Sequence, residues 1–205
     1  FVKTGSEATS AAIRIARAFT GKNKVPYWGY HGWHEWYIAS NEQYANGIPA
    51  DYKKYIFNFQ YNNIDSLHKL LKQHGNEMAC VIMEPIGLEF PKDNFLEKVK
   101  ELTHRYKTLL IFDETITGYR ISTGGAQELF HIIPDISVIG KAIGNGMPIA
   151  AVVGKKRIMD VCNRIFFSST FAGELLSIRA ALETIREIKQ KRVCEYINRL
   201  GNKLK

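Results

Sequence analysis

The sequence is poor in cysteine and lacks long apolar runs, and each shortage excludes a class of protein. The three cysteines, Cys80, Cys162 and Cys194, are odd in number and lack the paired spacing of a metal site or a redox motif. We therefore expect reduced thiols in a cytoplasmic protein. No run of about 18 or more apolar residues is present, so no membrane partner is expected. No signal peptide, internal repeat or low-complexity tract is visible either.

The chain has 205 residues, of which 45% are hydrophobic and 12% aromatic, enough to bury one full core. It begins at Phe1, already in an extended apolar run, rather than at a methionine. This start predicts a piece of a longer polypeptide, and the lack of a leader then says little about targeting.

Acidic residues are the scarcer charged type. Lys and Arg number 28 against 20 Asp and Glu, a net charge of +8, which would attract phosphates or nucleic acid. Much of the excess lies in 185–205, where apolar residues recur at helical spacing with cations on the other side. A solvated basic face on one helix is the simpler interpretation.

Short apolar runs alternate with amphipathic segments along the chain. Strands are predicted at 1–3, 25–28, 55–59, 79–85, 109–114, 136–140 and 149–154, and helices at 6–21, 64–75 and 94–107. This alternation predicts an α/β fold in which helices cover both faces of a mostly parallel sheet, a three-layer sandwich. In such sheets ligands bind beyond the carboxyl ends of the strands.

Polar residues follow several of these strands. Gly5 and Ser6 open the first helix, whose free N–H groups favour an anion such as phosphate, although an ordinary helix start capped by Ser6 explains them equally. Asp113 and Glu84 each lie at the carboxyl end of a predicted buried strand, where a carboxylate needs a cationic or hydrogen-bonding partner. A helix cap or an ion pair, for example of Asp113 with Arg120, is the structural alternative to a ligand role.

Lys141 lies in GKAIGNGMPIAA, directly after a predicted buried strand, so we expect its amine inside the fold. Apolar surroundings favour the free amine, which is a nucleophile and a Schiff-base former. A side chain that reaches solvent is the alternative for any single lysine. A phosphate cradle, an acid for a protonated ring nitrogen and an amine for an aldehyde together match pyridoxal 5′-phosphate (PLP).

The order of motifs along the whole chain resembles the class III, fold type I, PLP-dependent aminotransferases, and most of all their glutamate-1-semialdehyde aminomutase-like subgroup. The motifs are FVKTGSEATSAAIRIARAFTG, YHGWHEW, MEPIG, LLIFDETITGYR, GGAQELF, PDISVIGKAIGNGMPIAAVVG and FSSTFAGELLSIRAAL. The resemblance implies transfer of an amino group from an amino donor to a carbonyl acceptor. An intramolecular aminomutase reaction is the alternative, and the substrate stays open among amino acids, amino ketones and keto-sugars.

The resemblance also implies residue roles. Lys141 would form the Schiff base and move a proton, while Asp113 would pair with the pyridinium nitrogen. Gly5 and Ser6 would hold the phosphate, and Tyr30 would stack on the ring beside His31.

Three further positions follow from the resemblance. Thr115 stands where the family usually has valine, and its β-branched side chain keeps the packing role on the ring face. Thr170 matches the threonine that reaches the phosphate of a neighbouring subunit, which implies a homodimer. Glu84 keeps a place near the cofactor, although MEPIGLEFP lacks the glutamine found after EP in many relatives.

The implied organisation is a PLP-binding large domain at 1–184. A helix at 185–205 would then lead towards a C-terminal small domain, with the segments before and after the chain missing.

Two other interpretations concern the aromatic stretch YWGYHGWHEWYI. Aromatic and basic residues together could form a stacking platform for nucleic acid, but no RNA-binding signature accompanies them. His31, His34 and Glu35 do not have the HExxH spacing of a zinc site. We therefore expect neither a nucleic-acid partner nor a metal, and a packing role for these rings.

Overall fold

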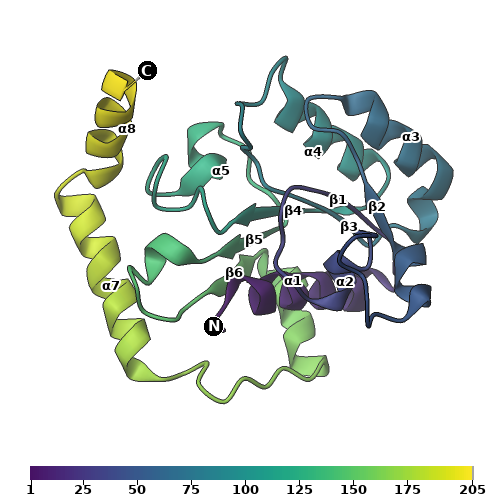
Figure 1. Ribbon diagram of the computed structural model, residues 1–205, viewed down its shortest axis with the longest axis horizontal. Coiled ribbons are helices and arrows are strands. Elements are labelled where there is room, and N and C mark those ends of the chain that lie inside the picture. The colour runs from purple at the N-terminus through teal and green to yellow at the C-terminus, as the bar shows by residue number, and fades with distance from the viewer. Residues whose placement is uncertain (205) are drawn as a thin grey trace.

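Six strands form one central sheet in the order β2-β1-β3-β4-β5-β6 in the computed structural model, which describes residues 1–204 (Figure 1). The strands are β1 (Val25–Trp28), β2 (Ile56–Asn58), β3 (Cys80–Met83), β4 (Leu109–Glu114), β5 (Ile136–Ile139) and β6 (Ala151–Gly154). Strands β1 to β5 pair in parallel, and β6 pairs antiparallel with β5. The predicted mostly parallel sheet is confirmed.

The first helix precedes the strands, and the others lie between and after them. They are α1 (Gly5–Thr20), α2 (Glu35–Ile38), α3 (Ile64–His74), α4 (Phe95–Arg105), α5 (Gly125–Leu129), α6 (Lys156–Met159), α7 (Leu175–Gln190) and α8 (Val193–Leu204). Short 3-10 helices occupy Ala50–Tyr55, Gly75–Glu77, Lys141–Ile143 and Asp160–Arg164. Within residues 1–204, none of these helices is long and apolar enough to cross a membrane.

The sheet carries a hydrophobic core on each face. Alternate side chains of a strand point to opposite faces, so Ile82 and Ile111 pack against α1, whereas Met83 and Phe112 pack against α3 and α4. Figure 1 shows α1 on one side of the sheet and α3 and α4 on the other. The predicted three-layer arrangement is therefore confirmed.

Helix α1 begins one residue earlier than predicted, and its cap is Thr4 rather than Ser6. The Thr4 hydroxyl accepts from the Glu7 N–H at 3.2 Å, and the Glu7 carboxylate accepts from the Thr4 N–H at 2.8 Å. This reciprocal pair is a capping box, which a Ser6 cap could not form because its third following residue is Thr9. Gly21 ends the helix in the left-handed region, with φ 67°, as expected.

Replacing Thr4 with alanine should lower the free energy of unfolding by about 1 kcal/mol, because the Glu7 N–H loses its acceptor. Denaturant unfolding of the full-length polypeptide measures this change. Thr20→Ala is the matched control, since that hydroxyl bonds the Ala16 carbonyl at the other end of α1. Equal losses in the two variants would contradict the capping role.

Both ends of the chain differ from the sequence prediction. Val2 forms an isolated bridge with Ala150 rather than a regular strand. The predicted helix at 185–205 is two helices, because Arg192 takes a left-handed conformation, with φ 50°, between α7 and α8. The amphipathic pattern continues across this turn, so periodicity does not reveal it. Helix α7 already begins at Leu175, so the proposed boundary at 184 lies inside a helix, and Lys205 lies outside the described residues.

Candidate functional site

A cavity of about 280 Å³ at the carboxyl ends of β4 and β5 brings together most of the predicted site residues. Those that line it are Gly5, Ser6, Tyr30, His31, Glu84, Asp113, Thr115 and Lys141. Thr170 is exposed and does not line it. Asp113 pairs in register with Val138 of β5, and Lys141 follows two residues after the end of that strand. Neighbouring parallel strands therefore deliver the acid and the amine to the same opening.

Asp113 is buried and held by His31, not by Arg120. The Oδ2 atom of Asp113 lies 2.8 Å from Nδ1 of His31, and Nε2 of His31 lies 3.0 Å from the Trp28 carbonyl oxygen. Both ring nitrogens of His31 thus face oxygen acceptors. Arg120 instead donates to the Ile116 carbonyl at 2.9 Å, so the ion pair considered from the sequence is wrong.

Thr115 holds the other oxygen of Asp113. Its N–H and its hydroxyl both donate to Oδ1, at 3.1 and 2.5 Å. Its methyl group lies beside Gly5 and Gly140, where an added Cβ would approach within 3.3 and 3.1 Å. Threonine thus keeps the shape of valine here and adds a hydrogen bond that valine could not make.

Lys141 is exposed, contrary to the expectation that it lies inside the fold. It follows Gly140, the first residue after β5, and begins the 3-10 helix Lys141–Ile143 at the cavity. Its φ is +42°, a left-handed conformation that costs a non-glycine residue free energy. The amine of Lys141 is therefore placed at the cavity by the end of strand β5, and it is not enclosed by apolar side chains.

The start of α1 presents open donors to the cavity. Glu7 and Ala8 donate to the Thr4 hydroxyl and carbonyl, while the Gly5 and Ser6 N–H groups have no acceptor within residues 1–204. A helix N-terminus with free N–H groups favours an anion. Gly32, with φ +96°, packs against this turn, and a Cβ there would lie 2.1 Å from the Ser6 hydroxyl. The glycine of YHG is thus required by close packing on Ser6.

Glu84 positions Tyr30 at the cavity wall. Its Oε2 atom accepts from the Tyr30 N–H at 2.9 Å. Burial raises the pKa of Glu84, the Tyr30 N–H opposes that shift, and the nearby Asp113 adds to it. A Cβ on Gly29 would lie 2.5 Å from the Glu84 carboxylate. Tyr30 is 59% exposed and lines the cavity, so an aromatic residue stands at its opening.

Gly87, in the MEPIG motif, packs closely on Trp28. A Cβ on Gly87 would lie 2.3 Å from the ring of Trp28. A larger residue at this position would collide with the tryptophan.

Glu114, the last residue of β4, has a structural role. It is 1% exposed and does not line the cavity. Its carboxylate accepts from the N–H groups of Ala126 and Gln127, at 2.6 and 3.0 Å, and from the hydroxyl of Thr117 at 2.7 Å. It therefore fixes the start of α5.

Sequence reasoning missed several residues of the cavity, namely Lys3, Thr9, Gly32, Met147, Pro148 and Ile149. Thr9 donates to the His31 carbonyl at 2.8 Å, and its spacing of three residues from Ser6 on α1 could have indicated it. Lys3 stands directly before TGSEA, where its charge was a visible signal. Met147–Ile149 reach the cavity only because the chain turns back into β6.

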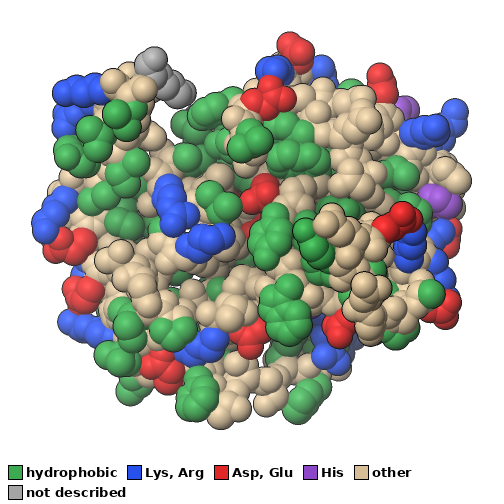
Figure 2. All heavy atoms as spheres, in the orientation of Figure 1, with side chains coloured by type: hydrophobic (Ala, Val, Ile, Leu, Met, Phe, Trp, Pro, Cys, Tyr) green, Lys and Arg blue, Asp and Glu red, His purple; other side chains and the backbone are tan. Residues whose placement is uncertain are grey.

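Only part of the aromatic stretch packs inward around His31, because Tyr30 and Trp33 are 59% and 72% exposed. Trp36 and Tyr27 are 6% and 8% exposed, and both contact the His31 ring. His34 bonds the Ser10 hydroxyl at 2.7 Å, so the two histidines serve different partners. Figure 2 shows basic and acidic side chains interspersed over the face in view rather than one basic band.

Comparisons with known proteins agree with this geometry. The family described as Aminotransferase class-III matches residues 1–205. A 3-aminobutyryl-CoA aminotransferase from Cloacimonas acidaminovorans is 44% identical over 209 residues, covering 98% of this chain and 50% of that protein. A glutamate-1-semialdehyde 2,1-aminomutase from Methanobrevibacter smithii is 37% identical over 220 residues, covering 100% of this chain and 52% of that protein.

A comparison with solved structures also finds an aminotransferase. An ornithine aminotransferase from Toxoplasma gondii superposes with a TM-score of 0.89 at 28% identity, covering 98% of this chain and 51% of that one. That structure has PLP at partial occupancy in its active site. The chain thus spans about half the length of the curated relatives it matches. Because the family match extends over the whole sequence, the chain belongs to the class III aminotransferase family.

Proposed function

We propose that this chain forms the PLP site of an enzyme that moves an amino group from an amino donor to a carbonyl acceptor. One observation carries the proposal. Asp113 and Lys141, at the ends of adjacent parallel strands, open onto one cavity together with the free N–H groups of Gly5 and Ser6.

The residues present fit PLP. A buried carboxylate suits a protonated ring nitrogen, an exposed amine suits an aldehyde, and a helix N-terminus suits a phosphate. Asp113, Lys141 and the start of α1 supply these three groups around one opening. Tyr30 would lie against the ring, and Thr115 would close the opposite side beside Gly5 and Gly140.

Bound PLP would supply an aldehyde that condenses with amines and a ring that withdraws electrons from the substrate carbon. The chain's own residues supply the rest. His31 and Thr115 bond the two oxygens of the Asp113 carboxylate and so fix its orientation, and this carboxylate would hold the ring nitrogen of the bound cofactor. Lys141, exposed at the cavity, can take a proton on Nζ and return it to a neighbouring atom.

The intramolecular aminomutase reaction is the second candidate, and the similarity to glutamate-1-semialdehyde aminomutases favours it. The two reactions differ in whether they need a separate carbonyl acceptor. With PLP and one amino donor but no carbonyl acceptor, an aminomutase releases isomerised product, whereas an aminotransferase stops after one amino group per site.

We also propose a homodimer in which Thr170 reaches the neighbouring subunit's site. Its exposure and its absence from the cavity of its own chain support this role. The domain division at 184 and the cytoplasmic location stay predictions.

The proposal predicts that the full-length polypeptide, supplied with PLP, acquires a visible absorption band, because the Lys141 amine attaches to the aldehyde. Borohydride should bleach this band and fix the cofactor permanently to the chain. Mass spectrometry of the digested protein should then find the added mass on the peptide that carries Lys141. A colourless protein, or a label on another lysine such as the exposed Lys156, would reject the assignment.

A further inference from the structure

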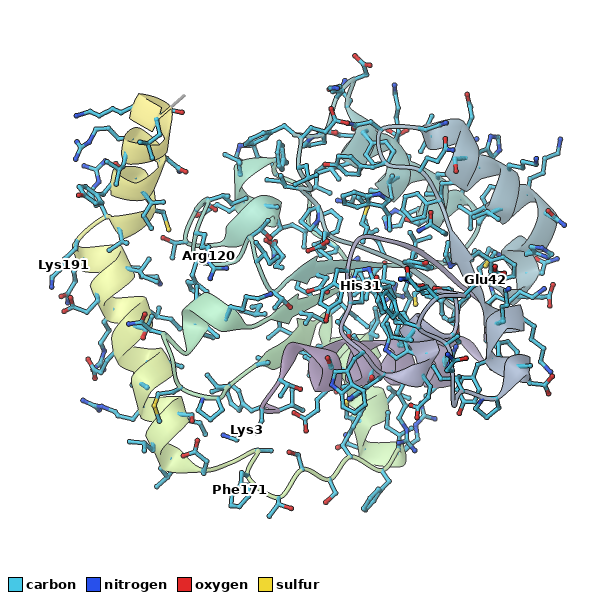
Figure 3. All side chains as sticks on the ribbon, in the orientation of Figure 1. Lys3, His31, Glu42, Arg120, Phe171 and Lys191 are labelled. Carbon is cyan, nitrogen blue, oxygen red and sulfur yellow. The ribbon has the colours of Figure 1, made fainter. Side chains whose placement is uncertain are left out.

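Lys3 connects the cavity to a distant part of the chain. It lines the same cavity as Lys141, yet its ammonium group bonds Oε1 of Glu174 at 2.7 Å, across 171 positions of sequence. The side chains of Lys3 and Glu174 are only 14% and 29% exposed. Figure 3 shows Lys3 between the amino-terminal segment and the loop that carries Phe171. Neither partner has a role assigned by the proposed function.

Both partners are fixed to the start of a helix. The Lys3 N–H donates at 2.9 Å to Glu7, the acid of the α1 capping box. Glu174 is the N-cap of α7, and both of its oxygens lie 3.1 Å from the Ser177 N–H. The ion pair therefore joins the N-termini of α1 and α7 directly.

The loop 166–174 has few other attachments. Within residues 1–204, its backbone hydrogen bonds are local, from Ala172 to Ser169 and from Glu174 to Phe171. The Phe167 ring adds a contact with Arg14, whose guanidinium carbon is 5.9 Å from the ring centre. Apart from the N-cap bond inside α7, Lys3 makes the side-chain hydrogen bond that holds this loop to the cavity wall.

We propose that Lys3 is a positioning residue whose ammonium group, through Glu174, fixes the loop 166–174 relative to the cofactor cavity. The loop carries Thr170, so the functional consequence rests on the proposed function above. Through this pair, the wall of one subunit's cavity sets the position of the loop that serves the neighbouring subunit. Loss of the Lys3 ammonium group would make the loop 166–174 more mobile, while the positions of Lys141 and Asp113 in the cavity would not change.

Hydrogen exchange of backbone amides in the full-length polypeptide, supplied with PLP, tests the proposal. Lys3→Met keeps the length of the side chain and removes its charge, so the amides of Ala172, Glu174 and Ser177 should exchange about fivefold faster. In the Lys3→Arg protein these amides should exchange at rates close to those of the unmodified protein, because arginine keeps the positive charge. Faster release of PLP from Lys3→Met is expected as the second readout, because the loop no longer holds its place.

The matched control is Lys24→Met. Lys24 bonds Glu77 at 2.8 Å and is 17% exposed, but it lies outside the cavity. Equal exchange in the Lys3→Met and Lys24→Met proteins would overturn the proposal. Unchanged exchange together with a raised KM for the amino donor would also overturn it, because the ammonium would then bind substrate. Exchange is measurable even if no cofactor attaches to Lys141, so failure of the proposed function remains distinguishable.

Discussion

Replacing Lys141 with alanine should abolish amino-group transfer by the full-length polypeptide while leaving the fold intact. The side chain is exposed at the cavity, so its removal leaves no gap in the core. A positioned acid-base group alone contributes about 10²–10⁴-fold to a rate, and loss of the attaching amine adds to that effect. We expect the rate of the first half-reaction to fall at least about 10³-fold.

Stopped-flow measurement of this half-reaction with a saturating amino donor gives the rate. Lys156→Ala is the control, because Lys156 is an exposed lysine paired with Asp160 outside the cavity. A Lys141→Ala protein with a rate close to that of the control would remove Lys141 from the reaction.

The backbone at this position provides a separate check that the variant is folded. Because Lys141 has φ +42°, glycine fits the conformation better than alanine. Lys141→Gly should therefore be more stable than Lys141→Ala by about 1 kcal/mol, while both proteins are inactive.

Replacing Asp113 with asparagine should leave some PLP bound but lower the rate at least about 10²-fold, equal to about 2.7 kcal/mol of activation free energy. Asparagine has nearly the same shape but no negative charge to keep a ring nitrogen protonated. It also disturbs its neighbours, because Thr115 donates to one oxygen and His31 faces the other. One donor would then meet an amide NH₂ group, which costs about 1–3 kcal/mol of stability.

The control for this variant is Asp135→Asn. Asp135 is equally buried, at 3% exposed, and accepts from the Leu110 N–H at 2.9 Å, away from the cavity. Both variants should lose stability in denaturant unfolding, but only Asp113→Asn should lose turnover. Loss of turnover in both proteins to the same degree would show that the effect is general destabilisation and would contradict a direct role for Asp113.

The sequence predicted more of the fold than of the contacts within the site. Each strand from β1 to β6 lies inside a run that the sequence predicts as a strand. The central strands β3 and β4 are buried throughout, and a strand buried on both faces needs a nearly continuous apolar run. The turn after α7 was not predictable, because Arg192 adopts its left-handed conformation without interrupting the amphipathic pattern. The predicted Ser6 cap was wrong, because the backbone geometry of the first turn decides which residue caps a helix. In that turn, Thr4 and Glu7 form the capping box.

By itself, the sequence determined the alternation of strands and helices and the position of Asp113 and Lys141 at strand ends. Both depend only on residues adjacent in the sequence, because the apolar periodicity and the ends of strands are properties of short segments. The tertiary structure alone decided which residues meet. Only the order of strands brings His31 to Asp113 across 82 positions, and only the return of the chain past β6 brings Glu174 to Lys3. Such pairs depend on how distant segments pack, and no local pattern encodes that packing.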